Sequence, residues 1–162
     1  MTVLAELKRQ SDARFLAIYE ALAQKGFGPL DAEVAKALKF RPQAIRKLPL
    51  ETRARQARRI LSSRASPELC YELFGTYLVR TRKELVTGFL DATGVPHAEG
   101  MIEDAEEKRP AAEKIPGAVA ALDLQFAAED VTLYLALCAQ TWPDCEVFAR
   151  LWRERAGQGV TP

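Results

Sequence analysis

Apolar residues recur three and four positions apart along almost the whole of this 162-residue chain. This spacing places them on one side of an α-helix, which completes a turn every 3.6 residues. No segment shows the strict alternation of apolar and polar residues, rich in β-branched side chains, that is typical of strands. The pattern therefore predicts an all-α fold, a helical bundle or stacked helical hairpins with about six to eight helices.

Glycine, proline and capping residues divide this pattern into separate helices. Gly26-Phe27-Gly28-Pro29 is expected to end the first helix, Asp31 to cap the second, and Pro42 to open the third. An interruption is expected near Ala127 and Ala128. The predicted helices cover residues 3–25, 32–38, 42–48, 50–63, 67–93 and 119–141, and a last helix begins at Pro143.

The length of the chain corresponds to one domain. We expect a single all-α domain over residues 1–156, followed by a flexible tail over 157–162. The distribution of charge divides this domain further. The divisions are a basic half over 36–83, an acidic connection over 95–112 and an acidic half over 113–156.

Neither a membrane nor export is indicated. The longest uncharged apolar stretch, 131–143, has 13 residues, whereas a membrane-spanning helix needs about 20. It is predicted to be a buried core helix. Glu6, Lys8 and Arg9 interrupt the region where a secretory signal is apolar, and the three cysteines lack the CxxC spacing of zinc or redox sites. We expect a soluble, cytoplasmic protein with buried thiols and no membrane partner.

Charges are strongly segregated along a chain whose formal net charge is only +1. Residues 36–83 hold 13 basic and 3 acidic side chains, and residues 84–162 hold 6 basic and 14 acidic ones. Such a separation can attract a polyanion, or it can pair the two halves within one subunit or across a homodimer. In the helix predicted over 50–63, Arg53 lies at the flank of the apolar side, so it needs a carboxylate or carbonyl partner if it is buried.

Residues 31–48, DAEVAKALKFRPQAIRKL, resemble the helix-turn-helix motif of DNA-binding proteins. The resemblance implies that the second helix enters the major groove and that its outward residues contact base edges and phosphates. Lys39 departs from the motif, because it stands where glycine is usual and must adopt a positive φ. The apolar and small positions of the motif are filled by Val34, Ala35, Leu38, Phe40, Ile45 and Leu48.

His97 is the only histidine, and it stands in the segment GVPHAEGMIED. Together with Glu99, Glu103 and Asp104 it offers a metal site, or with Glu99 alone a general base and its orienting acid. Neither a second histidine nor a pair of ligands at helical spacing accompanies it. The sequence therefore favours a turn histidine bound to backbone, and it assigns no catalytic residue, no metal and no cofactor.

These observations favour a non-enzymatic interaction or regulatory module. Its partner is expected to be another protein, a second copy of the chain, or nucleic acid. The alternative is a DNA-binding protein of the helix-turn-helix type, and the third option is a metal or small-molecule enzyme that depends on His97. The surface that we expect to bind, the basic face, consists of Arg41, Gln43, Arg46, Lys47, Arg55, Arg58 and Arg59.

Overall fold

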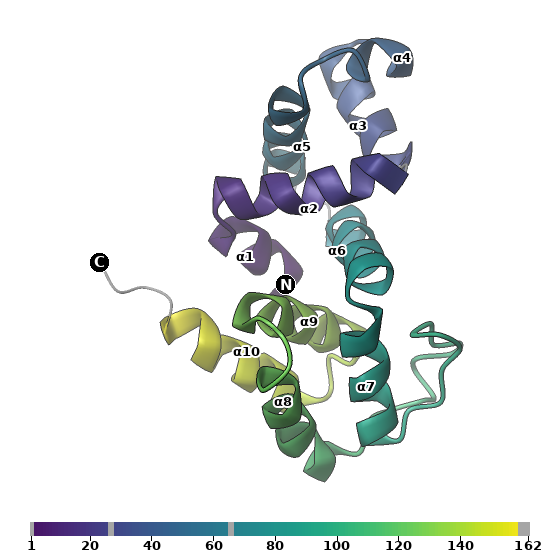
Figure 1. Cartoon of the computed structure of the whole chain (residues 1–162), viewed down its shortest axis with the longest axis vertical. Helices are drawn as coiled ribbons and strands as arrows, with labels where there is room; N and C mark the ends of the chain where they lie inside the picture. The colour runs from purple at the N-terminus through teal and green to yellow at the C-terminus, as the bar shows by residue number, and fades with distance from the viewer. Residues whose placement is uncertain (1, 26–27, 65–66, 159–162) are drawn as a thin grey trace. The chain divides into compact units, whose positions relative to one another are not determined.

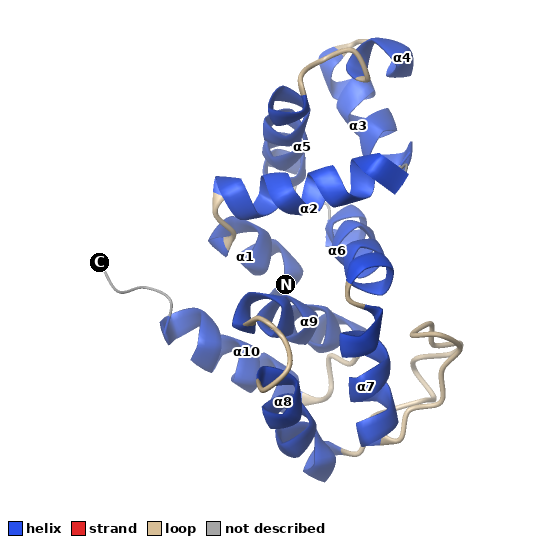
Figure 2. Ribbon diagram, viewed as in Figure 1, coloured by secondary structure: helices blue, strands red, loops and turns tan. Residues whose placement is uncertain are grey.

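A computed structural model describes residues 2–25, 28–64 and 67–158 of the chain. All regular structure in these ranges is helical (Figure 2), apart from one isolated bridge between Ala98 and Met101. The predicted all-α class is confirmed. The α-helices are α1 (Thr2–Arg9), α2 (Asp12–Lys25), α3 (Gly28–Leu38), α4 (Pro42–Ile45), α5 (Leu50–Arg64), α6 (Pro67–Thr81), α7 (Lys83–Thr93), α8 (Ile115–Asp123), α9 (Ala128–Thr141) and α10 (Glu146–Gln158), and a 3-10 turn, η1 (Ala112–Lys114), precedes α8.

The described ranges contain more helices than the six to eight predicted, because three long predicted helices are each divided in two. The helix predicted over 3–25 is divided between α1 and α2. There the Ser11 hydroxyl accepts a hydrogen bond, 3.1 Å long, from the backbone N–H of Arg14. A serine three residues before the amide that it caps is an N-cap, and it starts a new helix although the apolar spacing continues across the break.

The helix predicted over 67–93 is divided at Arg82. The Arg82 guanidinium donates to the carbonyl of Thr81 at 2.8 Å and to the carboxylate of Asp130 at 2.7 Å. The Asp130 side chain is only 2% exposed, so this contact compensates a buried charge. The third division, between α8 and α9, confirms the interruption expected near Ala127 and Ala128.

Several predicted boundaries are wrong by one turn or less. Asp31 is not an N-cap, because α3 already begins at Gly28. The helix after Pro42 ends at Ile45 rather than at 48, and the last helix begins at Glu146 rather than at Pro143. The last helix also includes residues 157 and 158, which the predicted tail contained. The remainder of that tail, 159–162, and residues 26–27 of the first predicted helix end lie outside the described residues.

Contacts between Cα atoms group the chain into two compact units, with the boundary inside α6 between Tyr77 and Leu78. In the N-terminal unit, α5 packs against α2 and α3, and α4 packs against α3 (Figure 1). In the C-terminal unit, α9 packs against α8 and α10, and α8 packs against α7. The expected single domain over 1–156 stays a prediction, because two compact units can belong to one domain.

The core of the C-terminal unit is built around α9. Every residue from 131 to 139 is buried, which confirms the predicted core helix. The ring of Phe89 meets the Tyr134 ring edge-on at 5.3 Å between centroids and the Phe148 ring at 5.9 Å. None of the helices in the described ranges is long and apolar enough to cross a membrane.

We expect Phe89→Ala to lower the free energy of unfolding by about 3–5 kcal/mol, because it removes a fully buried ring and leaves a cavity. Leu124→Ala is the control, since that side chain is 89% exposed and its loss changes stability by less than about 0.5 kcal/mol. Urea denaturation followed by circular dichroism measures both. Equal stabilities for the two variants contradict the packing described here.

Candidate functional site

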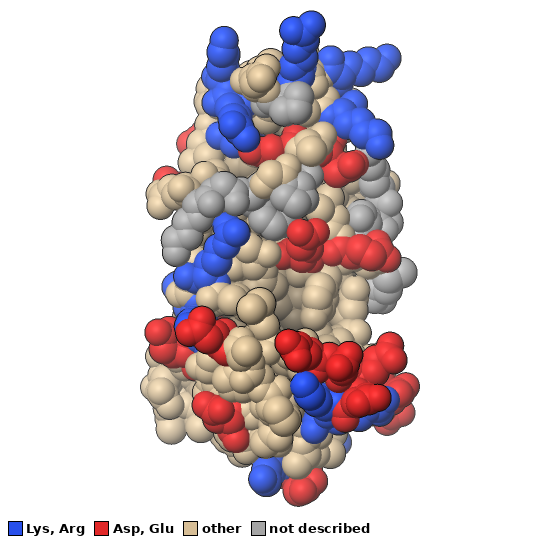
Figure 3. Space-filling view, turned by 90° about the vertical axis from the view of Figure 1, so that its right-hand side faces the viewer, with Lys and Arg blue, Asp and Glu red and all other residues tan. Residues whose placement is uncertain are grey.

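The stretch from the last turn of α3 through α4 to the start of α5 is strongly basic. Residues 36–49 contain five basic side chains and no acidic one. Figure 3 shows lysine and arginine side chains projecting from the end of the N-terminal unit where α3, α4 and the start of α5 lie. We define the basic tip as seven exposed residues of this stretch: Lys36, Lys39, Phe40, Arg41, Gln43, Arg46 and Lys47.

A Schellman motif sets the backbone of the basic tip. The N–H of Phe40 donates to the carbonyl of Ala35 at 2.8 Å, and the N–H of Lys39 donates to the carbonyl of Lys36 at 3.2 Å. These two bonds satisfy carbonyls that the end of α3 leaves unpaired. Lys39 takes the left-handed conformation that the motif requires, with φ +56°. This confirms the positive φ expected for Lys39, which costs an L-residue about 1–2 kcal/mol.

Ile45 anchors α4 and thereby orients the rest of the tip. Its side chain is fully buried, and Pro42 provides the first turn of this four-residue helix. The outward positions expected from the sequence, Arg41, Gln43, Arg46 and Lys47, are all exposed. The basic tip therefore presents its polar side chains to solvent. Its backbone is held by the Schellman motif at the end of α3 and by the buried side chain of Ile45 in α4.

The apolar positions of the helix-turn-helix resemblance are filled only in part. Val34, Ala35 and Ile45 are buried, as expected. Phe40 is not, because half of its side-chain surface is exposed to solvent, and the expectation that it packs inward is wrong. Leu48 is half-buried, and the side chain of Leu38 lies outside what the structure describes.

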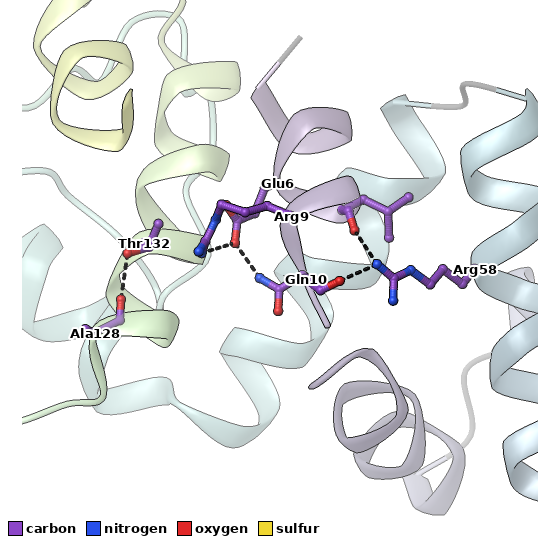
Figure 4. A network of polar contacts seen from close by, with 7 residues as sticks. Glu6, Arg9, Gln10, Arg58, Ala128 and Thr132 are labelled. Carbon is purple, nitrogen blue, oxygen red and sulfur yellow. Dashed lines mark hydrogen bonds and ion pairs between the residues drawn. The ribbon is translucent and has the colours of Figure 1, made fainter. Parts of the chain in front are cut away.

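Arg58 belongs to the architecture of the N-terminal unit and not to the basic face. Its guanidinium donates to the backbone carbonyls of Leu7 and Gln10 (Figure 4). It also binds the carboxylate of Asp12 and lies over the ring of Phe15. Only 20% of the side chain is exposed. Arg58 thus satisfies carbonyls at the end of α1 and the first acid of α2. The other two arginines predicted on this helix, Arg55 and Arg59, are exposed.

Arg53 has a carboxylate partner, as expected from its position at the flank of the apolar side of α5. Its guanidinium pairs with the Asp31 carboxylate at 3.3 Å and lies over the ring of Tyr19. The Tyr19 hydroxyl donates to the same carboxylate at 2.9 Å. Burial, and secondarily the bond to Asp31, raises the pKa of Tyr19 far above its ordinary value, so the phenol stays protonated. This cluster joins α2, α3 and α5 within the N-terminal unit.

His97 is a turn histidine, in agreement with the favoured interpretation. Its Nδ1 accepts a hydrogen bond from the backbone N–H of Gly100 at 3.1 Å, so its Nε2 carries the proton that is shared with Asp91 at 3.0 Å. Glu99 pairs instead with Lys83 at 3.0 Å. The structure does not assemble His97 with Glu99, Glu103 and Asp104 into a group of metal ligands within the described ranges.

The thiols are mostly shielded. Cys70 and Cys138 are buried and Cys145 is half-buried. Burial raises the pKa of the Cys70 thiol to about 12 and raises that of Cys138 as well. The two buried cysteines therefore remain protonated and unreactive near neutral pH, as the sequence predicted for them.

A hollow of about 200 Å³ between α2 and α5 was not anticipated from the sequence. Leu16 and Ala54 contribute apolar surface to it, and charged groups of both signs, including Glu51 and Arg55, line it. This balanced lining, open to solvent, does not single out one kind of ligand. The basic tip, which has one sign of charge, is the stronger candidate for binding.

No family model, curated protein or solved structure matches this chain.

The strain at Lys39 predicts that Lys39→Gly raises the free energy of unfolding by about 0.5 kcal/mol, because relief of the steric cost outweighs the extra backbone entropy, about 0.5–1 kcal/mol, that glycine loses on folding. Lys36→Gly removes the same charge from within α3 and is expected to lower stability by about 0.5–1 kcal/mol. Thermal unfolding of the two variants distinguishes backbone strain from loss of charge. A destabilised Lys39→Gly variant contradicts the assignment.

Arg58 and Arg59 are adjacent on α5 but are expected to respond differently to truncation. Arg58→Ala leaves carbonyls of α1 without a donor, and it should cost about 1.5–3 kcal/mol of stability. Arg59→Ala should change stability by less than about 0.5 kcal/mol. Denaturant midpoints measure the difference, and equal midpoints rule out the structural role of Arg58.

Proposed function

We propose that this protein is a non-enzymatic binding module and that its basic tip, with Arg55 and Arg59 beside it on α5, binds the phosphates of a nucleic acid. One observation carries the proposal. The five cations of the tip are exposed, and their side chains have no hydrogen bond or ion pair with any residue that the structure describes. A surface of one sign attracts a polyanion strongly, because each phosphate contact releases condensed counterions.

Several basic residues outside the tip are compensated within their own unit. Arg53 pairs with Asp31 in the N-terminal unit. In the C-terminal unit, Lys83 pairs with Glu99 and Arg155 pairs with Asp123. Internal compensation therefore accounts for these charges, but it does not account for the basic tip.

The composition of the basic tip favours nucleic acid over a protein partner. Stable protein interfaces contain a desolvated apolar centre in which charged residues are depleted. Phe40 is the only large apolar side chain of the tip, and its chain neighbours Lys39 and Arg41 are both cationic. Arginine, lysine and glutamine are the side chains that bind phosphates and base edges.

Major-groove binding by the helix-turn-helix resemblance is the second candidate function. The left-handed turn at Lys39 and the burial of Val34 and Ile45 support it. However, α4 is a single turn, and Arg46 and Lys47 lie in the turn that follows it. A recognition helix presents successive turns to the groove, so this geometry favours contact with the phosphate backbone over reading of the groove by residues 42–48.

The double variant Arg46→Ala with Lys47→Ala tests the proposal. We expect about tenfold weaker binding of a fluorescein-labelled oligonucleotide at low salt, and a slope of log K against log salt that is smaller by about 2, because two phosphate contacts are lost. Fluorescence anisotropy at several salt concentrations measures both quantities.

The matched control is Arg150→Ala with Arg153→Ala on α10, which removes the same charge from exposed positions of the C-terminal unit. This control should bind as the unchanged protein does. Binding that is insensitive to salt, or lost equally in both double variants, overturns the proposal.

A further inference from the structure

Two helices of this chain end in the same backbone motif with different residues. At the end of α7, Gly94 takes the left-handed position with φ +76°, and the following Val95 is 3% exposed. At the end of α3, Lys39 takes that position and the following Phe40 is 50% exposed. A Schellman motif is normally accompanied by an apolar contact of its last residue with the helix. The α7 end has glycine and a buried last residue, whereas the α3 end has lysine and a half-exposed last residue.

Both differences occur in a strongly basic stretch of the chain. Residues that are unfavourable for the local backbone or packing are expected at functional sites, where they serve the function. Lysine in place of glycine adds a cation to the tip, and an exposed ring adds a flat apolar surface between Lys39 and Arg41. Lys39 and Phe40 thus each provide a group that can contact a polyanion with aromatic rings: the first a cation, the second a flat apolar surface.

We infer that Phe40 is a stacking platform for an unpaired base and that the basic tip binds single-stranded nucleic acid in preference to duplex. This inference rests on the proposed function and specifies its ligand. In a single strand the faces of the bases are accessible, so one base stacks on Phe40 while its flanking phosphates meet Arg41, Arg46 and Lys47. In a duplex the bases are already paired and stacked, so the ring finds no free face.

Phe40 is distinguished from the other large exposed apolar residues of the described chain, Met101 and Leu124, by its aromatic ring and its neighbours. An anionic membrane also attracts cations with a nearby aromatic residue, but a membrane-binding surface buries a broad apolar face. The tip offers one ring, together with the amide of Gln43 and the guanidinium of Arg41 as hydrogen-bond donors. These groups match base edges and phosphates better than acyl chains.

The experiment compares the unchanged protein with Phe40→Ala, Phe40→Trp and the control Met101→Ala. The probes are labelled 15-nucleotide single strands of deoxythymidine and of uridine, a hairpin duplex with the same number of phosphates, and vesicles containing phosphatidylserine. Circular dichroism first shows that each variant keeps its helix content, which we expect because both substituted side chains are half or more exposed.

We expect the unchanged protein to bind at least one single strand about tenfold more tightly than the duplex. Phe40→Ala should lose about tenfold on that strand and less than about twofold on the duplex, because stacking contributes to only one of the two complexes. Phe40→Trp should retain affinity, with Trp fluorescence quenched on binding beyond that of the unchanged protein. Met101→Ala should bind normally.

Different results overturn the inference and the proposed function. Salt-dependent binding that is equal for strand and duplex, and unaffected by Phe40→Ala, overturns the inference and leaves the proposed function standing. Vesicle binding that depends on Phe40, without binding to any oligonucleotide at low salt, overturns both.

Discussion

The Arg58 guanidinium is the one side chain of α5 that reaches both α1 and the first residue of α2 in the contacts described above. The chain turns between α1 and α2, and backbone carbonyls at that corner need donors that the helices themselves do not provide. Arg58 reaches them from α5 and also meets the first acid of α2, so one side chain joins three helices. Arg53 joins α2, α3 and α5 in a similar way through Asp31 and Tyr19. With these two arginines turned inward, Arg55 and Arg59 are the exposed arginines of α5 among the described residues.

Periodicity and composition predicted the fold class, the buried helix α9, and the need for a partner at Arg53. They did not predict which arginine of α5 is structural, because a helical wheel places Arg58 on the polar side as surely as Arg59. Its role depends on a corner 46 residues earlier in the chain, opposite Asp12, and that corner is marked only by the Ser11 cap. The break at Arg82 likewise depends on a buried carboxylate at Asp130, which spacing along one helix does not reveal.

The sequence predicted some residues of the basic tip and not others, and the difference has a physical reason. Exposure of Arg41, Gln43, Arg46 and Lys47 follows from the burial of Ile45, a pattern that is visible in the sequence. The helix-turn-helix resemblance places Phe40 among the apolar positions that pack between the two helices. One signal could have corrected this: Phe40 lies between two cations, and the residue before it is a lysine in a glycine position.

A formal net charge of +1 is compatible with binding a polyanion, because charge acts locally in salt solution. At physiological ionic strength the Debye length is about 8 Å, so charges much farther than this from a phosphate contribute little to its binding. The five cations of residues 36–49 have no acidic residue within that stretch, and the acids of the C-terminal unit include several that are engaged by basic residues of the same unit. Binding of a polyanion at the tip would therefore depend on the charges close to it, which include Glu33 and Glu51 beside the stretch as well as the five cations. A stacking residue is valuable in such a cluster, since electrostatic attraction weakens with salt while the contact between a ring and a base does not.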